Sequence, residues 1–203
     1  MLKQTFLDLV APYDTDAAGL MLWKDLETRY TEKYRYYHTL HHLAQMLGQL
    51  NEVKTEIADW PVVLFSLFYH DSIYNTRKKD NEEQSAAYAT SCLKRLNLPA
   101  VSIEKIGVQI LATKSHKLST DPDTNLFTDA DLSVLGADWL SYSDYTRQIR
   151  KEYALYPDLL YKPGRKKVLL HFLEMPVLFK TPHFFNRFEN QARENMSREL
   201  AGL

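Results

Sequence analysis

Apolar side chains recur at the three- and four-residue spacing of helices along most of the chain, whereas alternating runs of β-branched residues are scarce. Only six glycines interrupt this pattern, which predicts an all-α protein. The predicted helices span residues 3–10, 15–33, 38–56, 60–73, 81–97, 100–114, 129–136, 139–155, 163–175 and 183–200. Two stretches between them, NTRKKDN (75–81) and KLSTDPDTNLF (117–127), have the composition of surface loops.

The predicted helix over 38–56 is apolar on two sides. Leu43 and Leu47 fall on one side, and Met46 and Val53 fall on the other. A helix with two apolar sides belongs at the centre of a core, because only there can both sides be buried. We therefore expect this helix to be central.

The next predicted helix, over 60–73, is apolar almost all round. Asp59 is a candidate N-cap, Pro61 falls in the first turn, and the sequence VVLFSLFY follows. The helix then ends with His70 and Asp71 side by side. A helix carboxyl end favours a bound cation over an anion, and an isolated carboxylate beside so apolar a helix is costly without a partner.

Three of the seven histidines in the chain lie within the stretch RYYHTLHH (35–42). On a helix His38 and His42 lie one turn apart on the same side, with His41 beside them. That spacing suits a metal site or a proton-transfer site. The alternative is a polar helix face that happens to be rich in histidine, and we expect His41 to be a surface or hydrogen-bonded residue.

His42, the pair His70 and Asp71, and Asp131 in DADLS come from three different helical segments. Two imidazoles and two carboxylates suit a divalent metal ion such as Mn, Fe, Co, Ni, Zn or Mg, with positions left for water. Water bound to such an ion has a lowered pKa and can attack phosphorus near neutral pH. The alternative for Asp131 is a capping box with Thr128 three residues earlier.

The order H…HD…D on an all-helical chain resembles the HD superfamily of metal-dependent phosphohydrolases. YHTLHH is similar to the tyrosine-histidine motif of cyclic nucleotide phosphodiesterases, which implies that His38 is the proton donor and His42 a metal ligand. A bacterial group of predicted HD phosphohydrolases of about this length is similar over most of the chain. The matching segments are ADLS, FYHD, DNEEQSA, TKSH, IRKEY, GRKKVLLHFL and NQARENM.

The resemblance implies an HD-domain helical bundle that hydrolyses a phosphoester of a nucleotide or a related small phosphorylated metabolite. His42, His70, Asp71 and Asp131 would hold the metal ion, and Asp71 thereby takes part in catalysis. One alternative is an HD-fold di-iron oxygenase. Dinuclear HD sites usually have extra histidines between the HD pair and the final aspartate, and here only His116 lies in that interval. We therefore expect one metal ion. The other alternative is a non-catalytic binding or regulatory module.

Two acidic residues after the HD pair are candidates for a catalytic base. Glu82 and Glu83 lie in KKDNEEQSA, within reach of metal-bound water if the segment folds back on the site. Asp80 and Glu83 also have capping spacing, so a helix start explains the same acids without catalysis.

Four residues are candidates for contacts with a substrate phosphate. Lys114 and His116 in LATKSH could bind phosphate, and His116 could bind a second metal ion, or both could belong to a solvated helix end. Arg35 and Arg77 could contact phosphate, although charged loops are more often only solvated.

Length and composition narrow the possible domain organisation and the possible partners of the protein. The chain of 203 residues suits one core, so we expect a single domain over 1–203. The 25 basic and 26 acidic residues give a net charge of −1, which argues against a nucleic-acid partner. Cys92 is the single cysteine and is expected in the core. The longest apolar run, WPVVLFSLFY, is too short to span a bilayer, so we expect a cytoplasmic protein without a membrane partner.

Overall fold

A computed structural model describes residues 1–13 and 18–203. Over these residues the chain is helical and has no strand, which confirms the all-α prediction. The α-helices are α1 (Leu2–Val10), α2 (Ala18–Tyr30), α3 (Leu40–Glu52), α4 (Trp60–Tyr69), α5 (Asn81–Arg95), α6 (Ala100–Ala112), α7 (Pro122–Leu132), α8 (Trp139–Glu152), α9 (Asp158–Leu173) and α10 (Pro182–Gly202). The first three residues of the helix predicted over 15–33 lie outside the described residues.

Contacts between Cα atoms divide the chain into two compact units, Met1–Thr128 and Asp129–Leu203, and the division falls within α7. The single domain over 1–203 stays a prediction. Among the described residues, every helix is too short or too polar to cross a membrane.

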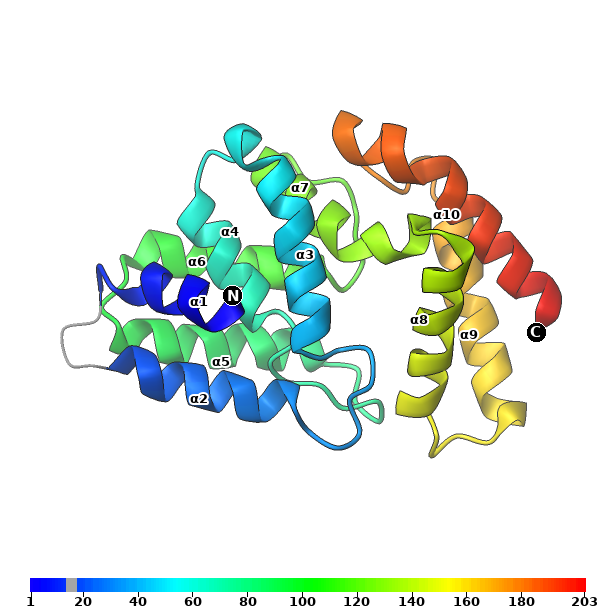
Figure 1. The fold of residues 1–203 in the computed structure, drawn as a ribbon, viewed down its shortest axis with the longest axis horizontal. Helices are drawn as coiled ribbons and strands as arrows, with labels where there is room; N and C mark the ends of the chain where they lie inside the picture. The colour runs from blue at the N-terminus through cyan, green and yellow to red at the C-terminus, as the bar shows by residue number, and fades with distance from the viewer. Residues whose placement is uncertain (14–17) are drawn as a thin grey trace. The chain divides into compact units, whose positions relative to one another are not determined.

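Helix α4 is the centre of the first unit (Figure 1), where α1, α3, α5 and α6 contact it. Its start follows from the sequence, because the Asp59 side chain accepts a hydrogen bond from the backbone N–H of Val62 at 3.3 Å and Pro61 occupies the first turn. Every residue from Val62 to Tyr69 is buried. Because this run is buried, His70 and Asp71, which follow it directly, begin next to the core.

Helix α3 begins at Leu40, two residues later than predicted. Thr39 is its N-cap and accepts a hydrogen bond from the backbone N–H of His41 at 3.3 Å. His38 therefore precedes the helix, and the prediction that it shares a helix face with His42 is wrong. The central position of α3 is confirmed, since residues on both of its apolar sides are 2% exposed or less: Leu43, Met46, Leu47 and Val53.

Helix α7 begins inside the segment 117–127, so the prediction of a surface loop there is wrong. Asp121 accepts a hydrogen bond from the backbone N–H of Thr124 at 3.1 Å, and Pro122 is the first helical residue. An aspartate cap followed by proline is typical of a helix start. The same two residues are also common in turns, which is why the sequence pattern predicts a loop here. Asp123 and Thr124 in the first turn are buried, and Asp123 accepts hydrogen bonds from the backbone N–H groups of Ala58 and Asp59 at 2.9 and 2.8 Å.

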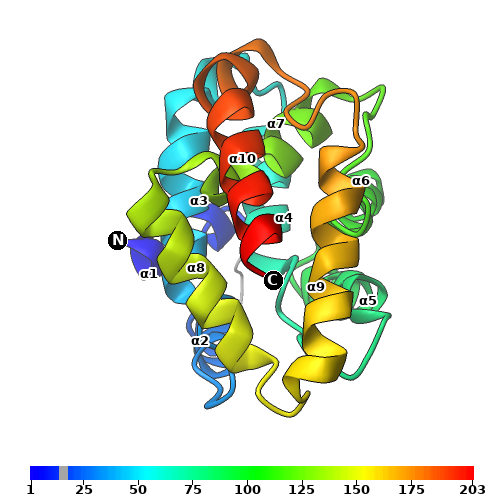
Figure 2. The ribbon, with the colours of Figure 1, turned by 90° about the vertical axis from the view of Figure 1, so that its right-hand side faces the viewer.

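Helices α8, α9 and α10 belong to the second unit (Figure 2). Side chains on all three helices form one polar network. Arg165 on α9 donates two hydrogen bonds to Glu199 on α10, at 2.7 and 2.9 Å, and the Tyr142 hydroxyl on α8 donates to the same carboxylate at 2.5 Å. The short 3-10 helix Ser133–Gly136 approaches α10 closely at Gly136. A Cβ atom on this residue would lie only 2.6 Å from the carbonyl oxygen of Phe188, so a glycine is needed here.

Candidate metal centre

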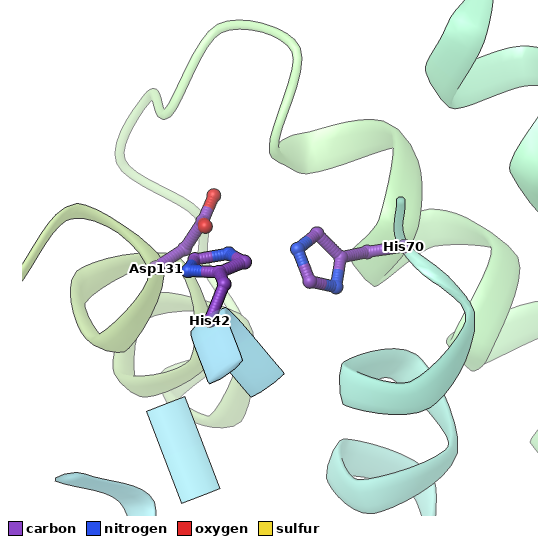
Figure 3. Close-up of side chains that lie close together, drawn as sticks. All are labelled: His42, His70 and Asp131. Atoms are coloured by element: carbon purple, nitrogen blue, oxygen red, sulfur yellow. The ribbon is translucent and has the colours of Figure 1, made fainter. Parts of the chain in front are cut away.

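His42, His70 and Asp131 lie together although they come from α3, the end of α4 and α7. One ligand atom from each side chain lies within 4.8 Å of the other two, and Figure 3 shows the three side chains turned toward one another. Both histidines are buried, at 2% and 1% exposure, and Asp131 is half-buried. Nitrogen and carboxylate ligands of one divalent ion are separated by roughly 3–4 Å, so a small contraction of the cluster would suit a metal ion.

His70 is oriented by the helix that it ends. Its Nδ1 atom lies 2.9 Å from the carbonyl oxygen of Leu67, which can only accept a hydrogen bond. Nδ1 is therefore the donor, and when the ring is neutral the lone pair is on Nε2. A histidine whose second nitrogen donates to a backbone carbonyl is a typical arrangement for a metal ligand.

Asp71, the fourth predicted ligand, is not part of the group of three, but its carboxylate lies beside Nε2 of His70. Its Oδ2 atom lies 3.1 Å from Nε2 of His70, and the side chain is 19% exposed. A carboxylate oxygen and a neutral imidazole nitrogen are both acceptors, so this approach is favourable when a proton or a metal cation is shared between them. The separation is close to the roughly 3 Å expected for neighbouring ligands of one metal ion. The residues present therefore fit a divalent cation.

His38 lies at the border of the cluster. Its Nε2 atom is 3.9 Å from Oδ2 of Asp71, its side chain is 19% exposed, and its ring stacks on Tyr74 with centroids 4.3 Å apart. His38 is therefore close to the predicted ligands without being part of the group of three. Tyr74 was missed in the sequence, because a single aromatic residue after the HD pair carries no chemical signature by itself.

Aromatic rings surround the buried histidines. The Tyr37 ring lies 4.8 Å from that of His42, and the Phe127 ring lies 5.8 Å from that of His70 in an edge-on arrangement. Such walls lower the local dielectric constant, which strengthens the attraction between a cation and its ligands.

Arg35 is buried against the backbone of Asp71 and Ser72 and does not face solvent. Its side chain is fully buried and donates hydrogen bonds to the carbonyl oxygens of His38, Asp71 and Ser72 at 3.2, 2.6 and 3.2 Å, and to the Glu32 carboxylate at 3.1 Å. A buried guanidinium with these contacts does not face a substrate. The prediction that Arg35 contacts a phosphate is replaced by a structural role.

Glu82 and Glu83 begin α5 but lie in different surroundings. Burial raises the pKa of the half-buried Glu82 carboxyl, and the charge of Asp71 contributes to the rise. The exposed Glu83 pairs with Lys114, which lowers the pKa of Glu83 and raises that of Lys114. Lys114 also donates to the carbonyl oxygen of Lys79 at 3.0 Å. Asp80 is the N-cap residue by position, without a side-chain cap hydrogen bond.

Three other histidine and arginine candidates lie outside the group of three. His116 is buried and has a left-handed backbone conformation with φ of 50°. Its backbone N–H donates a hydrogen bond to the carbonyl oxygen of Ala112 at 2.9 Å. Arg77 is exposed on the loop before α5, and His41 is exposed as expected.

Thr128 is a buried residue within α7, so the capping-box alternative for Asp131 is wrong.

Comparisons with protein-family models, with curated proteins and with solved structures find no match to this chain. The resemblance to the HD superfamily therefore rests on the sequence motifs, and the site rests on its own geometry.

Proposed function

We propose that the protein is a metal-dependent phosphohydrolase that cleaves a phosphoester of a nucleotide or a related small phosphorylated metabolite. The observation that carries the proposal is the grouping of His42, His70 and Asp131 within 4.8 Å, with the Asp71 carboxylate 3.1 Å from His70. These are the four ligands, in chain order, that the resemblance to HD phosphohydrolases implies. Their mixture of nitrogen and oxygen donors suits a divalent metal ion.

His42, His70, Asp71 and Asp131 would hold the metal ion. When bound, such an ion activates water as a nucleophile and neutralises charge on phosphate oxygens. The chain contributes the orientation of its ligands, since the hydrogen bond from His70 to Leu67 fixes which ring nitrogen faces the site.

His38 is the proposed proton donor to the departing oxygen, through its Nε2 atom. The partial exposure of its side chain allows contact with a substrate, and stacking on Tyr74 restricts the ring orientation. The Nε2 atom of His38 lies 3.9 Å from Oδ2 of Asp71, so the proposed acid stands beside a proposed metal ligand.

Glu82 is a better candidate than Glu83 for accepting a proton from attacking water. Its half-buried carboxyl is affected by the charge of Asp71, and its raised pKa makes it a stronger base. Glu83 is exposed and engaged with Lys114. Lys114 and Arg77 are exposed, and both remain candidates for contact with a substrate phosphate.

The proposal is tested with purified protein of known metal content, assayed against nucleotides and phosphorylated metabolites with Mn, Co, Ni, Mg, Zn or Fe. Metal-dependent release of phosphate or of a nucleoside product is the expected result. Oxygen consumption with iron would instead favour the oxygenase, and specific ligand binding without turnover would favour a binding module.

A further inference from the structure

We infer that Arg35 is a positioning residue of the metal centre, which holds the His38 segment and the His70–Asp71 turn in register. This inference rests on the proposed function. A single atom, Nη1 of Arg35, donates to the carbonyl oxygens of both His38 and Asp71, at 3.2 and 2.6 Å. The backbone of the proposed acid and the backbone of a proposed ligand therefore meet at one nitrogen.

The remaining contacts extend this clamp on both sides. Nη2 of Arg35 donates to the carbonyl oxygen of Ser72 at 3.2 Å, and Nε donates to the Glu32 carboxylate at 3.1 Å. The guanidinium also lies 5.1 Å from the ring of Tyr30 and 5.4 Å from that of Tyr74, which stacks on His38. Loop residues before α3 and the turn after α4 are thus held by one rigid, planar group.

Arg35 contacts the backbone of Asp71 through the carbonyl oxygen of that residue. Here the Oδ2 atom of Asp71 faces Nε2 of His70 at 3.1 Å, while Arg35 takes the carbonyl oxygen of the same residue. Arg35 thus holds the backbone of the residue whose carboxylate lies beside His70.

A lysine in this position would keep the positive charge and lose the geometry. Three nitrogen atoms of the guanidinium donate in fixed directions within a plane, whereas an ammonium group is a single point at the end of a flexible chain. Arg35→Lys therefore separates the charge of Arg35 from its ability to hold three carbonyl oxygens together.

Arg193 in the second unit offers a matched control. It too donates from Nε to a carboxylate, that of Glu189 at 2.7 Å, and from its terminal nitrogens to the carbonyl oxygens of Leu173 and Met175 at 3.0 and 2.8 Å. Arg193→Lys breaks the same kind of clamp without touching the segments that carry His38 and Asp71.

The test is titration of the full-length wild type, Arg35→Lys and Arg193→Lys with Co²⁺, followed by calorimetry and by the visible absorption of the bound cobalt. Thermal unfolding of each metal-free protein measures stability alongside. We expect Arg35→Lys to bind Co²⁺ roughly 10–100-fold more weakly, the usual effect of losing a group that orients metal ligands. Its cobalt spectrum should change, because the ligands move, while Arg193→Lys keeps the wild-type affinity and spectrum.

Unchanged affinity and spectrum in Arg35→Lys would overturn the inference, and so would equal losses in both variants, which would indicate general destabilisation. Failure of the wild type to bind Co²⁺ or any other divalent ion would overturn the proposed function, and this inference with it. If Arg35→Lys does not fold, Glu32→Ala decides the question, because it removes only the carboxylate on Nε. A weaker affinity for Co²⁺ in Glu32→Ala would then support the clamp, and an unchanged affinity would overturn it.

Discussion

Asp129 and Asp131 stand two positions apart on α7, yet their carboxylates have different neighbours. Asp129 is fully buried and accepts hydrogen bonds of 2.8 to 3.0 Å from the backbone N–H groups of Lys180 and Thr181 and from the Thr181 hydroxyl. The ammonium group of Lys180 lies 2.8 Å from its Oδ1. Asp131 instead groups with the ring nitrogens of His42 and His70.

The difference separates a structural carboxylate from a candidate ligand. Donors from the protein compensate the charge of Asp129, so its role is to hold the segment before α10. Asp131 lies instead with two imidazole side chains, and imidazole nitrogens and carboxylate oxygens can share one divalent cation. Two acids that are neighbours on one helix can therefore have different roles, and the side chains around each carboxylate distinguish them.

The largest effect on stability is expected from Asp129→Ala. Removing this carboxylate leaves the Lys180 ammonium and two backbone N–H groups buried without their acceptor, which costs about 3–5 kcal/mol in free energy of unfolding. Asp131→Ala is the matched control, and in metal-free protein it should cost about 1 kcal/mol or less. Urea denaturation of both variants in the presence of a chelator measures this, and equal losses would contradict the distinction.

The largest effect on metal content is expected from Asp71→Ala. This change removes a ligand and leaves the charge of the cation poorly compensated, so the metal retained per chain should fall to background. Asp80→Ala, which removes an acid at the start of α5 that makes no side-chain cap hydrogen bond, should retain the wild-type amount. Elemental analysis after loading with Mn, Co, Zn or Fe decides the matter. Equal retention by wild type and Asp71→Ala would exclude Asp71 as a ligand.

His38 and His42 are expected to differ in a way that activity alone would not reveal. His42→Ala should lose metal and activity together, whereas His38→Asn should keep the metal and lose rate. The loss should be roughly 10²–10⁴-fold for a substrate with a basic alkoxide leaving group, and much smaller for a nitrophenyl ester. An equal loss on both substrates in the metal-loaded variant would show that His38 is not the acid.

The smallest effect is expected from Glu82→Gln in metal-free protein. The folded state raises the pKa of Glu82 above its ordinary value of 4.5, so the native protein binds the proton more tightly than the unfolded chain. Wild-type stability therefore decreases as pH rises through that value and up to the raised one. Glu82→Gln removes this loss and should stabilise the protein at pH 7 by less than ~1 kcal/mol, with no gain at pH 3. Urea denaturation at both pH values measures the gain, and a gain that persists at pH 3 would contradict it.

The parts of the fold that were predicted correctly carry strong local signals. The run VVLFSLFY and its Asp59 cap predicted α4, and the pair that follows the helix marked the candidate site. The start of α7 was missed because aspartate and proline suit both helix starts and turns, and tertiary burial of Asp123 decides between them. The role of Arg35 depends on contacts with Asp71 and Ser72, more than 30 residues away, which no local pattern records.

Anomalous diffraction from crystals of the wild-type protein loaded with Mn²⁺ tests the central claim most directly, because it locates the metal ion rather than its effects. The account predicts one strong peak per chain, roughly 2.0–2.3 Å from a ring nitrogen of His42, a ring nitrogen of His70 and carboxylate oxygens of Asp71 and Asp131. Two strong peaks with His116 bound to one of them would contradict the mononuclear site and favour the oxygenase. No peak at these four residues would contradict the metal centre itself.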